Sequence, residues 1–424
     1  MDFDDGVRAI GNGGLLGCAF QPRRSQRDPE SPSDRGFGVV RVSAASRSVD
    51  RMGAMNELIN ADAVARLRAQ LATAAPGLAL PRLALVGDEL GDLSLRELSL
   101  RERTDLVSAA LLADLPGDYP SAATIVRRAL ADPGFAGWTM WPVGETVTTL
   151  ALGAAGHPDA AHFDDGLELL AEITPRLTSE FAIRRMLEAD LPRALPVVLQ
   201  WTRHPNDHVR RLASEGTRAF LPWAIRVRSL LAAPDATVPI LDALYRDESD
   251  YVRRSVANHL NDLARQNPEL VVEVASRWLA EPDENTAWVV RHGLRTLVKK
   301  AHPGALGLLG YAPVSVAVSA PVLVSPSVTL PGELGFTFEL TNTGETTERM
   351  AVDYVVHFVK SNGGQAEKVF KLAATTLEPG ESVTLTKRHA LRQMTTRVHY
   401  AGRHSLELQI NGERHTRTDF DVVL

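Results

Sequence analysis

Cysteine is almost absent from this chain of 424 residues, since Cys18 is the only one. The sequence therefore has no disulfide framework and no cysteine-based metal site. The 12 histidines are scattered and do not show the spacing of a metal-binding motif. We expect no bound metal ion and no small-molecule cofactor.

Several catalytic and membrane signatures are also missing. The chain contains no glycine-rich phosphate loop, no GxSxG elbow and no HExxH pair. No apolar run approaches the roughly 18 residues that a membrane-spanning helix needs. The net charge of -6 excludes a uniformly basic nucleic-acid binder but is compatible with a local cationic face. We expect a cytoplasmic protein, without a membrane partner, that associates with the nucleoid when it binds DNA.

A chain of 424 residues is too long for one ordinary domain. Its residue pattern changes twice and divides it into three parts. Residues 1–52 mix Gly, Ser, Arg, Asp and Pro without an apolar period, which predicts a disordered tail. Residues 53–312 have an almost unbroken helical pattern, and short Pro/Gly turns interrupt it. Residues 313–424 alternate apolar and polar positions between turns, which predicts an antiparallel β-sandwich of Ig-like architecture. Within it, "SNGG" and "INGE" are hairpin signals.

The helical part contains three related segments, "HPNDHVRRLASEG", "DESDYVRRSVANHLNDLA" and "NTAWVVRHGLRTLVKKAHP". Val209 and Val252 are 43 positions apart, and Val252 and Val290 are 38 apart. Self-similarity at about forty residues is typical of a HEAT-like (ARM-type) α-solenoid made of two-helix repeats. Each segment also opens with a possible helix cap, at Asn206 or Asp207, at Ser249, and at Asn285 or Thr286.

The helices of these repeats each combine a buried stripe with a polar face. In the middle repeat the apolar side chains recur at helical spacing, at Val252, Val256, Leu260 and Leu263. Basic residues lie on other faces of the same helices. A single basic face is usually solvated. Stacked repeats, however, align such faces into one concave basic strip, which suits a polyphosphate backbone.

Glu180 stands in the segment "TSEFAIR", where Thr178 or Ser179 can cap the helix that follows. A glutamate so early in a helix has a plain structural explanation, since it interacts favourably with the helix dipole. Its position alone therefore assigns it no chemistry.

Glu215 and Trp223 are the other two candidates. Glu215 shares a helical face with Arg211 and Arg218, so it can have a purely structural role as their ion-pair partner. Trp223 follows a proline in "LPWA", which places it in a turn and not on a buried helical stripe. It can still fill a gap in the core.

These residues lie in segments that resemble a known family. "SEFAIR", "HPNDHVRRLASEGTRAFLPWA", "YVRRSVANHLNDLA" and "WVVRHGLRTLVKKAHPGALGLLGY" resemble the AlkC branch of the AlkC/AlkD DNA alkylation-repair glycosylases. The resemblance covers most of residues 55–311 and is densest after Thr178. It implies a HEAT-like solenoid that wraps alkylated double-stranded DNA and cleaves the N-glycosidic bond of cationic bases of the 3-methyladenine class. Some members carry a C-terminal Ig-like domain. They need no cofactor, and we expect a monomer.

The resemblance also implies roles for individual residues. Glu180, Glu215 and Trp223 become the catalytic set, with Phe181 and Arg211 next to the lesion. A cationic base is a good leaving group, so the protein has to stabilise the oxocarbenium-like sugar and direct water to it. A carboxylate performs both tasks, and an indole face adds cation–π attraction.

Phosphate contacts are expected from polar residues of the same repeats. They are Arg184, Arg218, Arg253, Arg254, Asn258, Arg291, His292, Arg295, Lys299 and Lys300. The sequence departs from the family pattern at Arg185, where we expect a proline.

Two alternatives remain open at this point. The first is a non-catalytic HEAT-repeat scaffold that binds another protein. The second is a protein that binds damaged DNA without cleaving it. A carboxylate pair with an indole inside a basic face favours the glycosylase over the scaffold. The lesion that is preferred is not determined by the sequence.

Overall fold

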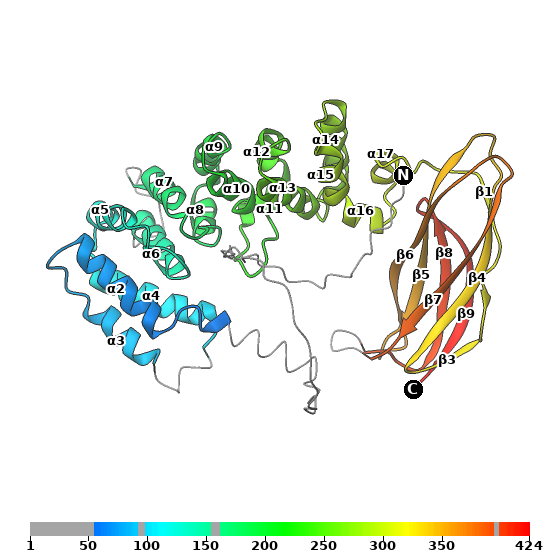
Figure 1. Ribbon diagram of the computed structural model, residues 1–424, viewed down its shortest axis with the longest axis horizontal. Coiled ribbons are helices and arrows are strands. Elements are labelled where there is room, and N and C mark those ends of the chain that lie inside the picture. Colours follow the sequence, from blue (N-terminus) through cyan, green and yellow to red (C-terminus); the bar gives the residue numbers. More distant parts are fainter. Residues whose placement is uncertain (1–54, 92–97, 154–161, 394–397) are drawn as a thin grey trace, which may run out of the picture. The chain divides into compact units, whose positions relative to one another are not determined.

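The computed structural model describes residues 55–91, 98–153, 162–393 and 398–424. The tail expected at residues 1–52 lies outside them. Helices occupy the chain from Ala61 to Leu308, and strands occupy it from Val316 to Val423 (Figure 1). The helices and the strands have separate hydrophobic cores. The predicted fold class, a helical solenoid followed by an Ig-like sheet domain, is confirmed. No helix among the described residues is both long enough and apolar enough to cross a bilayer.

The helices form two layers that pack against each other (Figure 1). The first layer consists of α4 (Leu100–Asp114), α6 (Met140–Leu152), α8 (Ile183–Ala189), α10 (Asp207–Glu215), α13 (Asp250–Leu263) and α15 (Thr286–Gly293). The second layer consists of α5 (Tyr119–Leu130), α7 (Phe163–Ile173), α9 (Leu191–Trp201), α12 (Val238–Leu244), α14 (Pro268–Ala280) and α17 (Pro303–Leu308). The remaining helices are α2 (Ala61–Ala74), α3 (Pro81–Glu89), α11 (Arg228–Ala232), the 3-10 helix η2 (Pro234–Thr237) and α16 (Arg295–Lys299).

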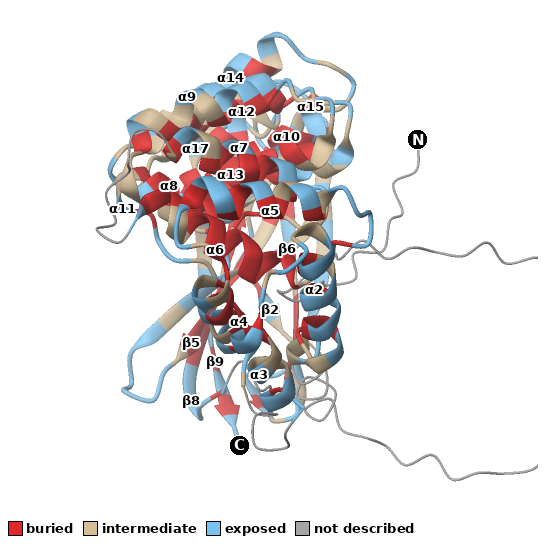
Figure 2. Cartoon of the chain, turned by 90° about the vertical axis from the view of Figure 1, so that its left-hand side faces the viewer, coloured by how far each residue is buried: buried red, intermediate tan, exposed pale blue. Residues whose placement is uncertain are grey.

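The buried residues of the helices, coloured red in Figure 2, form one hydrophobic core. In α13 the predicted stripe is confirmed, because Val252, Val256, Leu260 and Leu263 are at most 1% exposed. Successive first-layer helices can therefore stack on one continuous apolar core. This stacking brings residues about forty positions apart in the sequence into contact.

The predicted helix caps are only partly correct. Asn206 caps α10, since its side chain accepts a hydrogen bond from the amide of His208 at 2.9 Å. Ser249 precedes α13, but its hydroxyl donates to Asp207 at 2.9 Å instead of accepting from a helix amide. At α15 neither Asn285 nor Thr286 caps the helix with its side chain. The carboxylate of Asp283 instead accepts hydrogen bonds from the backbone amides of both residues, at 3.0 and 2.8 Å.

The C-terminal domain is built from two sheets. One contains β1 (Val316–Val318), β4 (Gly332–Asn342), β2 (Val322–Leu323) and β7 (Ser382–Leu391). The other has the order β3 (Ser327–Thr329), β9 (Glu413–Val423), β8 (Gly402–Ile410), β5 (Glu348–Val359) and β6 (Gln365–Leu377). All pairs are antiparallel except β3–β9. Both predicted hairpins are present, between β5 and β6 and between β8 and β9. The second uses positive φ at Asn411 and Gly412, as a tight hairpin turn requires.

Candidate functional site

Glu180 lies in the turn that leads into α8, and this turn is fixed to α7. Ser179 donates its hydroxyl to the carbonyl of Leu170 at 2.9 Å, and its amide donates to Thr174 Oγ1 at 3.3 Å. The helix itself begins after Ala182 without a side-chain cap. The expectation that Thr178 or Ser179 caps this helix is therefore wrong. The Ser179 hydroxyl bonds Leu170, and the Thr178 hydroxyl accepts from the Glu180 amide at 3.3 Å, which precedes the helix.

The carboxylate of Glu180 is buried and is held through one oxygen. Arg211 Nη1 donates to Glu180 Oε2 at 2.7 Å, and Thr178 Oγ1 donates to the same atom at 3.1 Å. Burial raises the pKa of Glu180 above its ordinary value, and the Arg211 charge offsets this only in part. Among the described residues, every hydrogen bond to this side chain goes to Oε2. Oε1 therefore remains able to accept a proton or orient a water molecule.

Glu215, in the last turn of α10, uses both of its oxygens. Oε1 accepts from Arg218 Nη1 at 2.6 Å, and Oε2 accepts from Ser255 Oγ at 2.6 Å. Burial alone would raise the pKa of Glu215, but the nearby Arg211 and Arg218 charges lower it below its usual range. Two carboxylates in one site thus have their pKa values pushed in opposite directions. This separation is the property that assigns different roles to paired carboxylates.

The two glutamates belong to a continuous row of charges. Arg211 bridges Glu180 and Glu215, with its Nη2 at 3.4 Å from Glu215 Oε1. The row continues through Arg218, whose Nε lies 2.9 Å from the Oδ2 atom of Asp262 in α13. Because every charge in the row has an opposite charge beside it, these buried side chains can remain ionised.

Aromatic rings stand beside the charges on the same layer. Phe181 stacks on Trp141 of α6, with centroids 4.5 Å apart and an interplanar angle of 24°. Tyr251, in the first turn of α13, lies under the Arg211 guanidinium with its ring centroid 4.8 Å from Cζ. The site therefore combines a carboxylate, its arginine and two aromatic surfaces.

Trp141 and Tyr251 were not predicted from the sequence. Tyr251 follows His208 by the same 43 positions that separate Val209 from Val252, so the repeat alone places these two rings at equivalent positions of neighbouring repeats. Trp141 had a weaker signal. It stands four residues before Glu145, to which its indole donates at 3.2 Å, and Glu145 in turn lies near Arg185.

Trp223 lies between α10 and α11, in a turn as predicted, and it is 70% exposed. Its φ of 61° is a left-handed conformation that a bulky side chain rarely adopts. Ile225, two residues later, is 48% exposed. The loop thus presents two apolar side chains to solvent.

Arg184 fixes the position of this loop by hydrogen bonds to its backbone carbonyls. Its Nε donates to the carbonyl of Ile225 at 2.6 Å, and its Nη1 donates to the carbonyls of Gly216 and Arg218 at 3.1 and 2.8 Å. The side chain is fully buried, and this burial, with the nearby Arg226 and Arg218 charges, lowers the pKa of Arg184 to about 10. The expectation that Arg184 contacts phosphate is wrong, because its guanidinium is enclosed by the protein.

Two other predicted phosphate contacts are also buried. Arg218 bonds Glu215 and Asp262, as described above. Arg253 donates from Nη1 to the carbonyls of Asp247 and Glu248, at 2.7 and 2.9 Å. The sequence places a basic residue on a helix but does not say which neighbouring carbonyls and carboxylates it meets. Neither guanidinium is available to a ligand on the surface.

The remaining predicted contacts are at or near the surface. Asn258, His292 and Arg295 are half-buried and bonded to one another, whereas the exposed ones are Arg254, Arg291, Lys299 and Lys300. Arg254 pairs with Asp250 at 2.7 Å. The two lysines follow α15, the last helix of the first layer. Exposed cations are thus present on α15 and shortly after it in the chain.

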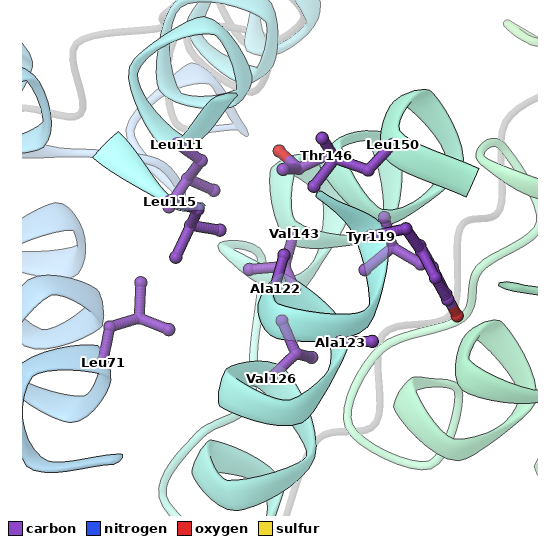
Figure 3. Close-up of a pocket in the computed structure, with 11 residues that line it drawn as sticks. Leu71, Leu111, Leu115, Tyr119, Ala122, Ala123, Val126, Val143, Thr146 and Leu150 are labelled. Atoms are coloured by element: carbon purple, nitrogen blue, oxygen red, sulfur yellow. The ribbon is translucent and has the colours of Figure 1, made fainter. Parts of the chain in front are cut away.

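A cavity at the start of the solenoid has no comparable chemistry (Figure 3). It lies among α2, α4, α5 and α6, and its lining is apolar apart from the hydroxyls of Tyr119 and Thr146. The Tyr119 hydroxyl donates to Asp165 at 2.7 Å, and the Thr146 hydroxyl donates to the carbonyl of Pro142 at 2.8 Å. Both hydroxyls are already occupied, so the cavity is a packing feature.

Both the helical part and the sheet domain are similar to known proteins. A family described as "DNA alkylation repair enzyme" matches residues 177–297, and the C-terminal Ig-like domain of the uncharacterised protein YhaZ matches residues 317–424. The protein YhaZ of Bacillus subtilis is 36% identical over 77% of this chain and 88% of its own length. The alkylpurine DNA glycosylase AlkC of Pseudomonas fluorescens, solved bound to DNA containing an abasic site analog, superposes with a TM-score of 0.71. It is 33% identical, over 87% of this chain and 99% of that one. The chain belongs to the AlkC-type DNA alkylation-repair family.

Proposed function

We propose that this protein is a DNA glycosylase that binds alkylated double-stranded DNA on its first helical layer and hydrolyses the N-glycosidic bond of cationic bases of the 3-methyladenine class. The support is the membership of the family and the similarity to an alkylpurine DNA glycosylase. The observation that carries the proposal is the Glu180 carboxylate, which is buried, has a raised pKa and is bonded through one oxygen only.

In the proposed reaction the bond between C1′ and the base nitrogen breaks, and its electron pair leaves with the base. The cationic base thereby becomes neutral, and positive charge develops on the sugar. The Glu180 carboxylate stabilises this charge electrostatically. A water oxygen then bonds to C1′, and Glu180 Oε1 accepts the proton that the water loses.

Neighbouring residues orient the Glu180 carboxylate and contact the base. Arg211 fixes its orientation through Oε2, and Glu215 holds Arg211 from the other side. Because Glu215 uses both oxygens in hydrogen bonds, we assign it to positioning and electrostatics. The exposed indole of Trp223 contacts the cationic base, and the cation–π attraction between them is worth roughly 0.5–2 kcal/mol. Phe181 and its Trp141 partner form the second aromatic surface.

The decisive experiment measures release of methylated bases from alkylated duplex DNA by the full-length protein and by Glu180→Gln. We expect release of 3-methyladenine by the wild type and a loss of at least about 100-fold in the variant, with DNA affinity retained. Wild-type protein that binds the DNA but releases no base would leave a damage-binding protein. A lack of DNA binding would instead favour the protein-binding scaffold.

A further inference from the structure

Trp288, in the first-layer helix α15, is the second exposed tryptophan among the described residues. All six tryptophans lie in the described residues, and among them only Trp223 and Trp288 are exposed. Trp288 stands in the first turn of α15 and is 39% exposed. An exposed indole offers a large apolar face, and tryptophan is enriched at binding interfaces for this reason.

The indole of Trp288 is held in a fixed orientation. It stacks on the ring of His292, one turn later in α15, with centroids 5.1 Å apart and an interplanar angle of only 6°. The His292 ring is itself fixed by α13, since its Nε2 lies 3.2 Å from Oδ1 of Asn258. Arg295 Nη2 donates to the same amide oxygen at 3.0 Å. The two stacked rings thus form a rigid platform.

The platform is uncharged, although cations surround it. Burial, together with the charges of Arg295 and Arg254, lowers the pKa of His292 to about 4, so the imidazole is neutral at physiological pH. Its Nε2 can then carry the hydrogen that is donated to Asn258. His292 stacks against one face of the indole.

The surrounding charges complement a polyanion. Arg291 lies three residues after Trp288, on the same side of α15, and it is exposed. Among the described residues it has no carboxylate partner within ion-pair distance. Arg254, on the neighbouring helix, is also exposed, and it pairs with the exposed Asp250 at 2.7 Å, a surface ion pair that a phosphate can replace. An exposed aromatic ring combined with cations on the same and the neighbouring helix is the combination that binds single-stranded nucleic acid, in which bases stack on the ring and phosphates pair with the cations.

We propose that Trp288 is a stacking platform for an unpaired nucleobase of the bound DNA, with Arg291 and Arg254 contacting the adjacent phosphates. The occupant is unpaired because the bases of an intact duplex already stack on one another. A partially opened strand, or the base left without a partner when a lesion is removed, supplies such a group. This site rests on the proposed DNA-binding function and extends it, since it makes the α15 end of the layer select distorted or gapped DNA.

The test compares full-length wild type with Trp288→Ala, Trp288→Phe and Trp288→Leu, using an oligothymidylate strand, an intact duplex and the same duplex with a one-nucleotide gap. Affinity is measured at several salt concentrations. Leu199→Ala is the matched surface control, because Leu199 is 38% exposed on α9 of the second layer. Circular dichroism verifies that each variant is folded.

We expect Trp288→Ala to lose about 5- to 100-fold in affinity for the single strand and the gapped duplex, and less than about twofold for the intact duplex. Trp288→Phe should retain most of the affinity, and Trp288→Leu should behave like Ala, because only an aromatic ring stacks on a base. The salt slope should stay at the wild-type value, since no charge is removed. Equal losses on all three DNAs, or no loss on any, would overturn the stacking site and leave the proposed DNA binding intact. Wild-type protein that binds none of them overturns the DNA-binding function itself.

Discussion

The Nη1 atom of Arg211 lies 2.7 Å from the Oε2 atom of Glu180, and this ion pair joins residues 31 positions apart in the sequence. It connects the turn before α8 to the middle of α10, so the pair exists only when adjacent repeats are stacked. The same arginine also reaches Glu215. Folding of the solenoid therefore assembles the candidate site.

Glu180→Gln should separate chemistry from binding. The amide keeps the size and the hydrogen-bonding capacity of the side chain but cannot stabilise positive charge or accept a proton from water. We expect base release to fall by at least about 100-fold at constant affinity for the duplex. Single-turnover release and fluorescence anisotropy measure the two quantities. Glu188→Gln, on the exposed side of α8, is the control, and a similar loss there would contradict a specific role.

The raised pKa of Glu180 has a consequence for stability. A group whose pKa is higher in the folded protein favours folding when protonated, and this contribution is lost as the pH rises through the folded pKa. The free energy of unfolding of the wild type should therefore fall, relative to that of Glu180→Gln, as the pH rises. The fall should occur between the ordinary glutamate pKa and the raised pKa of folded Glu180. Urea unfolding of both proteins over this range measures the difference. A constant or reversed difference would show that burial does not dominate at this carboxylate.

Base release by the wild type should follow the same ionisation. The ionised form of Glu180 is required, so the rate should decline as the pH falls through the raised pKa. Trp223→Phe serves as the comparison, because it lowers the rate without changing the carboxylate. Its pH profile should have the same midpoint as that of the wild type. A shifted midpoint would place the titrating group elsewhere.

Arg184→Lys tests whether the buried guanidinium positions the loop that carries Trp223. Lysine keeps the charge but cannot reach the carbonyls of Ile225, Gly216 and Arg218 with the same planar geometry. We expect faster amide exchange in residues 216–226 and roughly tenfold slower base release, since a small misplacement of a catalytic group slows a reaction strongly. The pH midpoint should not move. Unchanged exchange in the loop would refute the positioning role.

Arg291→Gln and Arg253→Gln form a matched pair that distinguishes a surface cation from a buried one. Removing a phosphate contact should reduce the salt slope of DNA binding by about one, uniformly across sequences. Arg291 is exposed, so Arg291→Gln should show this change with little loss of stability. Arg253→Gln should leave the slope intact and lower the free energy of unfolding, because two backbone carbonyls lose their donor. The reverse pattern would contradict the assignment of these two arginines.

The sequence by itself determined the solenoid and the sheet domain. Periodicity is a local property, so the stripe of Val252, Val256, Leu260 and Leu263 and the hairpin at Asn411 could be predicted without any long-range contact. The candidates Glu180, Glu215 and Trp223 also came from local segments, through their resemblance to a family. The structure places the two glutamates on one arginine and puts the tryptophan on an exposed turn.

Only the tertiary structure decided what each charged or aromatic side chain does. Arg184, Arg253 and Arg291 are all arginines of the helical repeats, yet two are buried under carbonyls and one is exposed. Trp141 meets Phe181 only because α6 packs beside α8. Helical spacing fixes the face of a side chain, but the neighbouring repeat decides whether that face meets solvent, a carbonyl or another ring. The physical reason is that burial and ion pairing depend on contacts between residues about forty positions apart, which no local pattern records.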